Sequence, residues 1–274
     1  VHVAERRLVG APPRPPGEAA GGELGGGGAP PVLPGGRGVA AESVAAGPPR
    51  VLPHGGGRQA GWFSPLLPAL ARRFRVHAVD LPGHGRSAPV APCTLDAMVD
   101  AVAGALADGT GPLGVLGWSL GGLVAMRWAA RDPERVSRLV LVATSPRFVA
   151  GPDWPHAMAA ATLARFGDEL EVAWRPALQR FLTLQVHGSE EGRSTLALMR
   201  HHLHARGDPS PGALRDALEV LASTDLRDEA RGIRPSALVI AGGRDTLAPA
   251  AAGEWLAHAL PRETCVRIGG AAHA

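Results

Sequence analysis

Three side chains in this sequence have the types, and the order along the chain, of a nucleophile, an acid and a base. Ser119 lies within residues 117–121, Gly-Trp-Ser-Leu-Gly, a pattern that places a serine on a sharp turn between a strand and a helix. Asp245 follows the apolar stretch 236–241, and His273 follows the next such stretch. We expect Ser119 to attack an acyl carbon, His273 to take and return its proton, and Asp245 to hold the tautomer of the imidazole.

A glycine run upstream predicts the groups that would bind an oxyanion. Residues 51–57 read Val-Leu-Pro-His-Gly-Gly-Gly, a short strand followed by glycines that leave backbone N–H groups unobstructed. We expect the backbone N–H groups of Gly56 and Leu120 to bind the oxyanion. We expect His54 to support the loop through a hydrogen bond rather than to take part in the chemistry.

A second acid, Asp225, also lies between Ser119 and His273 in the chain. It follows a segment with helical spacing, whereas Asp245 follows a predicted strand. Because open α/β sheets build their sites at the carboxyl ends of strands, we favour Asp245 as the acid of the triad.

The elements that must position these groups alternate along the chain. Strands that are apolar on both faces and alternate with helices indicate a mostly parallel sheet flanked by helices, with Thr94 as the N-cap of one helix. From 147 to 222 the alternation stops, and amphipathic helices predict an inserted helical lid. The sequence therefore predicts an α/β fold whose core is built from residues 50–146 and 223–274. The predicted strands after the glycine-loop strand lie at 75–80, 113–116, 139–143, 236–241 and 265–268.

Residues 1–49 have a different composition from the rest of the chain. They consist mostly of glycine, proline and alanine, including four consecutive glycines at 25–28. Such a segment buries too little apolar area to offset the entropy of ordering it. We expect a low-complexity, flexible segment.

Composition argues against several other classes of function. The net charge is only +3 and all 28 basic residues are arginines, without a dense basic run, so we do not expect nucleic-acid binding. Cys93 and Cys265 are expected to be buried small hydrophobes rather than a disulfide or a metal site. The histidines at 201, 202 and 204 lack a carboxylate at ligand spacing, so no metal and no organic cofactor is expected. Without a long apolar run or a signal peptide, we expect a cytoplasmic protein that does not bind membranes.

Further segments make this sequence similar to a known family. The chain from about 50 to 273 resembles the α/β-hydrolases, and within them the carboxylesterases of biotin synthesis. The tryptophan before Ser119, Phe-Leu-Thr-Leu-Gln at 181–185 and Asp-Leu-Arg at 225–227 are more specific than the motifs common to the whole fold. The segments that carry the resemblance are 117–125, 133–136, 181–185, 224–227 and 271–274.

The resemblance implies a serine esterase that cleaves the methyl ester of pimeloyl-[acyl-carrier protein] and releases methanol. It places Trp118, Phe181 and Gln185 near the acyl chain. It also implies an acyl-carrier protein as the partner, which is acidic and would meet arginines of the lid, and we expect a monomeric enzyme. The candidate arginines are Arg180, Arg193 and Arg200.

The sequence departs from this family at two places. Gly56 stands where these esterases tend to have tryptophan, so we expect a different channel wall with the same backbone donor. The sequence stops one residue past His273, where family members continue into a closing helix, so we expect the C-terminal helix to be missing. Two alternative hypotheses stay open: a broad-specificity short-chain esterase of the same fold, and a catalytically impaired binding protein.

Overall fold

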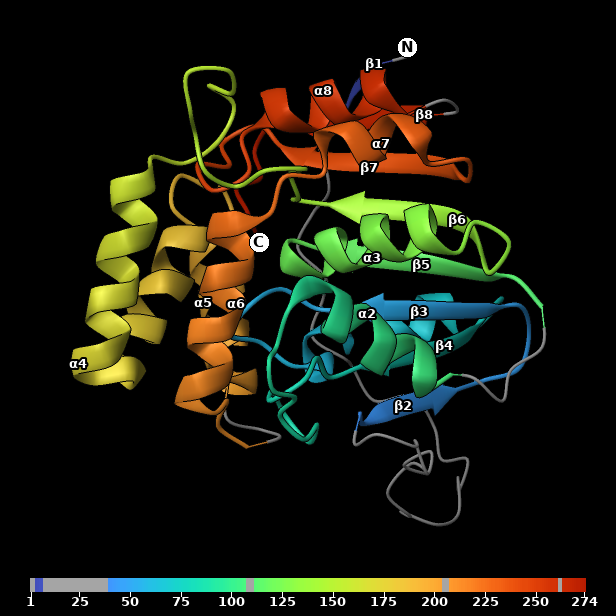
Figure 1. Ribbon diagram of the computed structural model, residues 1–274, viewed down its shortest axis with the longest axis horizontal. Coiled ribbons are helices and arrows are strands. Elements are labelled where there is room, and N and C mark those ends of the chain that lie inside the picture. The colour runs from blue at the N-terminus through green and yellow to red at the C-terminus, as the bar shows by residue number, and fades with distance from the viewer. Residues whose placement is uncertain (1–2, 7–38, 107–110, 204–206, 261–262) are drawn as a thin grey trace, which may run out of the picture.

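A mixed sheet of eight strands organises the molecule (Figure 1). The computed structural model describes residues 3–6, 39–106, 111–203, 207–260 and 263–274. In the sheet the strands follow the order β1-β8-β7-β6-β5-β3-β4-β2, and all neighbours are parallel except β2 and β4. The strands are β1 (Val3–Arg6), β2 (Ala41–Val44), β3 (Pro49–Pro53), β4 (Arg75–Val79), β5 (Leu113–Trp118), β6 (Val136–Val142), β7 (Ser236–Gly242) and β8 (Glu263–Ile268).

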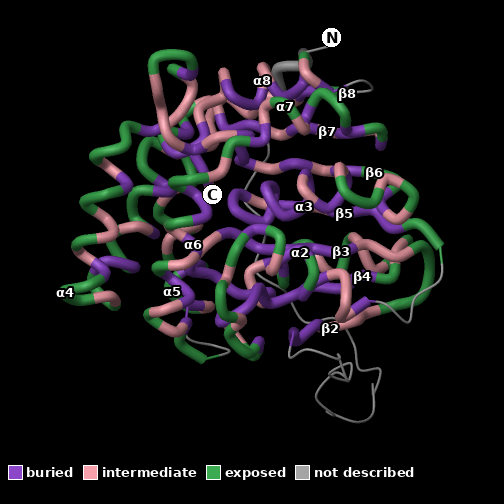
Figure 2. Tube along the Cα trace, in the orientation of Figure 1, coloured by how far each residue is buried: buried purple, intermediate pink, exposed green. Residues whose placement is uncertain are grey.

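Four helices cover one face of this sheet. Helices α2 (Leu95–Gly104), α3 (Leu120–Arg131), α7 (Arg227–Gly232) and α8 (Ala250–Ala259) lie in front of the strands in Figure 1. Between helices and sheet lies the main core, which Figure 2 shows as a buried band and which includes fully buried Leu123, Met126 and Leu141. Thr94 caps α2, since its Oγ1 accepts a hydrogen bond from the N–H of Ala97 at 3.1 Å, as predicted.

A smaller apolar cluster lies on the other face of the sheet. The short helices η1 (Ala60–Phe63) and α1 (Leu67–Leu70) pack there against β3 and β4. Leu52 and Val76 are fully buried in this cluster, and Trp118 packs at its edge. The residue before the predicted nucleophile is therefore held by a core that differs from the one under helix α3.

Among the described residues, three helices follow β6 within the range predicted to form a lid. They are α4 (Ala160–Gln185), α5 (Gly192–His202) and α6 (Pro211–Ser223), and Figure 1 shows them on the side to which the arrowheads of β3 and β6 point. Helix α4 is kinked: Ala173 has non-helical backbone angles, and Pro176 lacks the N–H that would continue the helical hydrogen bonds. We call α4 to α6 the helical insertion.

The prediction of a flexible segment over 1–49 is wrong at two places. Residues 3–6 form β1 beside β8, and residues 41–44 form β2 at the opposite edge, antiparallel to β4. Edge strands are held by backbone hydrogen bonds to one neighbour, which any residue except proline can form. The side-chain composition of the segment therefore did not predict these strands. Residues 7–38 of the predicted flexible segment lie outside the described residues.

Two further findings concern the described part of the chain. None of its helices is long and apolar enough to cross a membrane. Its histidines, cysteines and carboxylates form no group of three or more that could hold a metal ion.

Candidate active site

Ser119 sits on the turn between β5 and α3, in a backbone conformation that few residues other than glycine adopt. Its φ and ψ are 55° and −119°. Close approach of neighbouring backbone makes the flanking glycines necessary: a Cβ on Gly117 would lie 2.3 Å from the carbonyl oxygen of Gly121, and one on Gly121 would lie 2.1 Å from that of Pro53. The turn thus places the serine at the carboxyl end of the central strand β5, as the pattern predicted.

The structure brings Ser119, His273 and Asp245 together in one hydrogen-bonded chain. The Nε2 atom of His273 lies 2.9 Å from Ser119 Oγ, and its Nδ1 atom lies 2.8 Å from Asp245 Oδ2. All three residues are buried. Asp245 follows β7 and His273 follows β8, so neighbouring parallel strands deliver the acid and the base to the same edge.

The carboxylate of Asp245 is held in a fixed orientation. Its Oδ1 accepts hydrogen bonds from the backbone N–H groups of Leu247 at 2.8 Å and Ala248 at 2.9 Å, while Oδ2 faces the imidazole. An ionised carboxylate can only accept hydrogen bonds, so it favours the imidazole tautomer that carries the proton on Nδ1. Nε2 of His273 is then free to accept the proton of Ser119, which is the state a general base requires.

Backbone contacts with the helical insertion and with β5 hold the loop that carries His273. The N–H groups of His273 and Ala274 both donate to the carbonyl oxygen of Gln185, at 2.9 and 3.2 Å. The indole Nε1 of Trp118 donates to the carbonyl oxygen of His273 at 3.1 Å. The base is therefore fixed on both sides by residues that the sequence predicted to contact substrate.

Two backbone N–H groups next to Ser119 are free to bind an oxyanion. Within the part of the chain that the structure describes, neither Gly56 nor Leu120 donates its N–H to another group. The two residues are close, since a Cβ on Gly56 would lie 3.7 Å from Leu120 Cδ2. A pair of unused donors beside a nucleophile is the arrangement that stabilises a tetrahedral intermediate.

Two buried histidines support the Gly56 loop, as predicted for one of them. Nε2 of His54 accepts from the N–H of Leu81 at 2.9 Å, and Nε2 of His84 accepts from the N–H of Gly57 at 3.3 Å. Burial lowers the pKa of His84 below its ordinary value, which is opposed by its contact with the carbonyl of Pro82. The role of His84 was not predicted from the sequence. This residue lies in the turn after β4, where a histidine by itself does not indicate a supporting role.

Two cavities lie between the helical insertion and the loops of the site, and the smaller one adjoins the oxyanion loop. Phe166 and Phe181, both from α4, stack with ring centroids 4.6 Å apart and line two cavities. One of these cavities reaches Gly56 and Gly57, and the other, of about 360 Å³, reaches Leu247 next to Asp245. Phe181 therefore stands between the oxyanion loop and the acid loop, where an acyl chain could lie.

The remaining predicted residues occupy different places. Gln185 is buried, and its side-chain amide has no hydrogen-bond partner among the described residues. Arg180 is exposed, pairs with Glu169 at 3.0 Å and lines the larger cavity. Arg193 and Arg200 are exposed on α5.

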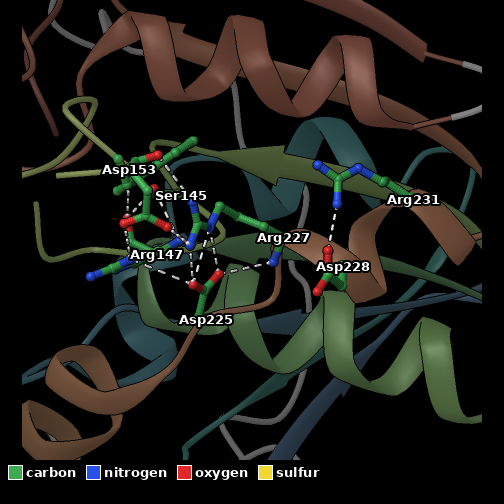
Figure 3. Close-up of polar contacts among 8 residues, drawn as sticks. Ser145, Arg147, Asp153, Asp225, Arg227, Asp228 and Arg231 are labelled. Atoms are coloured by element: carbon green, nitrogen blue, oxygen red, sulfur yellow. Dashed lines mark hydrogen bonds and ion pairs between the residues drawn. The ribbon is translucent and has the colours of Figure 1, made fainter. Parts of the chain in front are cut away.

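Asp225, the competing acid, takes part in a separate cluster of ion pairs (Figure 3). Its Oδ2 lies 2.7 Å from Arg227 Nη2, which also contacts Asp153 at 2.6 Å, and Arg147 completes the cluster. The hydrogen bond from Arg227 lowers the pKa of Asp225, with burial opposing the shift. The Asp-Leu-Arg segment thus ties the start of α7 to the loop after β6, whereas Asp245 alone of the two faces His273.

Comparison with known proteins agrees with this geometry. Residues 48–274 match the family described as the α/β hydrolase fold. The chain belongs to the α/β-hydrolase family. A relative from Chromobacterium violaceum, named pimeloyl-[acyl-carrier protein] methyl ester esterase, is 43% identical over 220 residues, which cover 80% of this chain and 85% of the relative. A protein of the same name from Nitrosomonas europaea is 41% identical over 215 residues, covering 78% of this chain and 84% of that one.

Among solved structures, an esterase from Exiguobacterium antarcticum has a TM-score of 0.79 over 86% of this chain and 88% of its own. Its sequence identity of 19% makes this likeness evidence for the fold alone. Together the comparisons confirm the predicted fold, the family and the class of carboxylic ester hydrolases. The roles assigned to individual residues stay predictions.

Proposed function

We propose that this esterase hydrolyses the methyl ester of pimeloyl-[acyl-carrier protein] to methanol and pimeloyl-[acyl-carrier protein], a step of biotin synthesis. The observation that carries the proposal is the hydrogen-bonded chain of Ser119, His273 and Asp245 in a member of this family whose relatives bear that name. The proposal places the reaction in the cytoplasm, with a monomeric enzyme and no metal or organic cofactor.

The geometry supports a two-step acyl transfer. Ser119 Oγ attacks the ester carbonyl carbon as its proton passes to His273 Nε2, and the resulting oxyanion binds the N–H groups of Gly56 and Leu120. The carbon–oxygen bond to the methoxy group breaks, and the imidazolium returns the proton so that methanol leaves. Water then attacks the acyl-serine, gives its proton to His273, and the acid product leaves as Ser119 recovers its hydroxyl.

The acyl group would reach the nucleophile from the helical insertion. Phe181 and Phe166 line the cavity of about 360 Å³, which has room for a chain of methylene groups, and they also line the small cavity of about 20 Å³ at the oxyanion loop. Gly56 contributes no side chain to this wall, where these esterases tend to have tryptophan.

The carrier protein would dock on the outer surface of the insertion. Arg193 and Arg200 are exposed on α5, and Arg180 is exposed on α4 beside the larger cavity. Exposed arginines attract an acidic partner and mainly raise the rate of association. Arg180 already pairs with Glu169, so Arg193 and Arg200 are the better sites for a test.

The decisive experiment is mass-spectrometric detection of demethylation of pimeloyl-[acyl-carrier protein] methyl ester, with Ser119→Ala as the control. We expect a mass loss of one methylene unit that disappears in the variant. A folded protein that hydrolyses short free esters but leaves this substrate intact would favour the broad-specificity esterase. Inactivity on both substrates would favour the binding protein.

Charge reversal tests the docking surface separately. We expect the double variant Arg193→Glu, Arg200→Glu to raise KM for the carrier-bound ester about tenfold or more, and to leave hydrolysis of a short free ester unaffected. The double variant Arg72→Glu, Arg73→Glu is the matched control, because both arginines are exposed just before β4, away from the insertion. Equal effects of the two changes on the carrier-bound ester would contradict the proposed docking surface.

A further inference from the structure

A buried arginine lies next to the predicted nucleophile, and its terminal nitrogens have no hydrogen-bond partner in the described part of the chain. Arg58 is only 2% exposed, and its Nη1 and Nη2 atoms have no hydrogen-bond partner among the described residues. Its guanidinium carbon lies 3.3 Å from the ring centroid of Trp118 and 4.7 Å from that of Trp62. The rings stabilise a cation through their faces but leave the N–H groups at the edge of the guanidinium unused.

Arg58 is close to the reaction centre. A Cβ on Gly55 would lie 3.2 Å from Ser119 Cβ and 3.6 Å from Arg58 Nε, so the arginine and the serine both lie against this glycine. Trp118, on which the guanidinium stacks, directly precedes Ser119 and bonds to the backbone of His273. Burial lowers the pKa of Arg58, while the carboxylate of Asp245 opposes that shift, which also places the two side chains within electrostatic reach.

The unused polar atoms of this guanidinium and of Trp62, one of the two rings on which it stacks, are donors that suit an anion. Besides Nη1 and Nη2 of Arg58, the buried Nε1 of Trp62 lacks a hydrogen-bond partner within the described chain. All three atoms can only donate. Arginine presents two parallel N–H groups whose spacing matches the two oxygens of a carboxylate.

We propose that Arg58 forms a carboxylate-binding subsite that holds the acid product of ester hydrolysis beside Ser119. The inference rests on the proposed ester hydrolysis, but not on the identity of the acyl group. An ester group is uncharged, whereas the acid released from the acyl-serine loses a proton and carries a negative charge that is shared by the two oxygens on the carbon that Ser119 had attacked. The subsite therefore distinguishes product from substrate, and the enzyme is inhibited by small carboxylates.

Equilibrium binding of butyrate and butyramide tests the subsite without any turnover. The two molecules have similar shapes and differ in charge, and Trp62 and Trp118 report binding through intrinsic fluorescence. We expect the wild-type protein to bind butyrate at least tenfold more tightly than butyramide. In Arg58→Leu this ratio should fall to about one, and Arg58→Lys should keep part of it.

Arg50→Leu is the matched control, because Arg50 also stacks on an aromatic ring, that of Phe74, but lies at the other end of β3. It should keep the wild-type ratio. Equal affinity of the wild-type protein for the two molecules would overturn the proposal even if Arg58→Leu did not fold, and so would an unchanged ratio in a folded Arg58→Leu protein. The binding ratio does not depend on the proposed substrate, so a protein that failed to hydrolyse the pimeloyl ester could still confirm or contradict this subsite.

A turnover assay identifies the source of the carboxylate. If Arg58 binds the product, dimethyl succinate and monomethyl succinate should be hydrolysed with similar kcat/KM, and butyrate should inhibit competitively. A preference of tenfold or more for the half ester that is lost in Arg58→Leu would place the carboxylate on the substrate and overturn the product assignment.

Discussion

The indole Nε1 of Trp118 donates a hydrogen bond of 3.1 Å to the carbonyl oxygen of His273. The residue before the nucleophile therefore fixes the backbone of the base, 155 positions further along the chain. Its ring also supports Arg58 on one face. One tryptophan thus joins the turn at the end of β5, the loop after β8 and the buried cation.

Trp118→Phe should keep the aromatic ring and remove this hydrogen bond. We expect the free energy of unfolding to fall by about 1 kcal/mol. We expect kcat/KM for a short ester to fall by about tenfold to a hundredfold, because small displacements of a base are costly. Trp255→Phe, in α8, is the control and should leave kcat/KM unchanged. Equal kinetics for Trp118→Phe and the wild-type enzyme would show that the bond does not position His273.

Asp245→Asn should abolish most activity while the protein stays folded. An amide keeps the oxygen that Leu247 and Ala248 bond to, but its NH₂ group cannot accept from Nδ1 of His273. The imidazole is then held in the wrong tautomer, and by the precedent of serine proteases kcat falls about 10⁴-fold. Steady-state kinetics on a short ester checks this.

The matched control is Asp225→Asn, which removes an equal charge from the cluster of Figure 3. It should keep near-normal kcat and lose some thermal stability, since Arg227 loses one of the two carboxylates with which it pairs among the described residues. If the effects of the two substitutions on kcat were reversed, Asp225 would be the acid of the triad.

Gly121→Ala should destabilise the fold. The new Cβ would lie 2.1 Å from the carbonyl oxygen of Pro53, and backbone on both sides has to move. Forced overpacking costs about 1–3 kcal/mol, which thermal or urea unfolding will detect. In Gly212→Ala, within α6, nothing lies within 4 Å of the new Cβ, so this control should be neutral or more stable. A Gly121→Ala protein as stable as the control would contradict the close approach.

Stability should fall on mild acidification because of His84. Burial lowers the pKa of this histidine in the folded protein, so the unfolded chain binds the proton more readily. The contribution is complete above the unfolded pKa of about 6.5 and is lost as the pH falls from there toward the lower folded pKa. One proton changes the free energy of unfolding by at most about 1.4 kcal/mol per pH unit.

We expect His84→Gln to reduce the slope of unfolding free energy against pH between pH 5 and 6.5. Part of this slope should remain, because burial also lowers the pKa of His77. Exposed His258 serves as the control site through His258→Gln. A slope in His84→Gln identical to that of the wild-type protein would exclude His84 as its source.

Much of the site could be predicted because its main signals are local. The glycines around Ser119 report a close backbone approach, and Asp245 and His273 each follow an apolar strand. The alternation of strands and helices predicted the parallel sheet, whose geometry then brings the carboxyl ends of these strands together.

The parts that sequence reasoning missed depend on contacts between distant segments or on the backbone. Arg58 looks like any surface arginine until Trp62 and Trp118 enclose it. Gln185 was expected near the substrate. Its backbone carbonyl oxygen accepts a hydrogen bond from the N–H of His273, and no pattern of side chains in the sequence predicts such a contact. Strand β2 was missed because its partner β4 lies more than 30 positions away.

The bond between the carbonyl of Gln185 and the N–H of His273 limits how the enzyme can open. Gln185 ends α4, so swinging the whole helix outward would pull on the base and disable the triad. We therefore expect any opening to involve the first half of α4, with the break at Ala173 as the hinge. In such an arrangement the gate moves while the catalytic base stays in place, and the rate of gating can change independently of the chemical step.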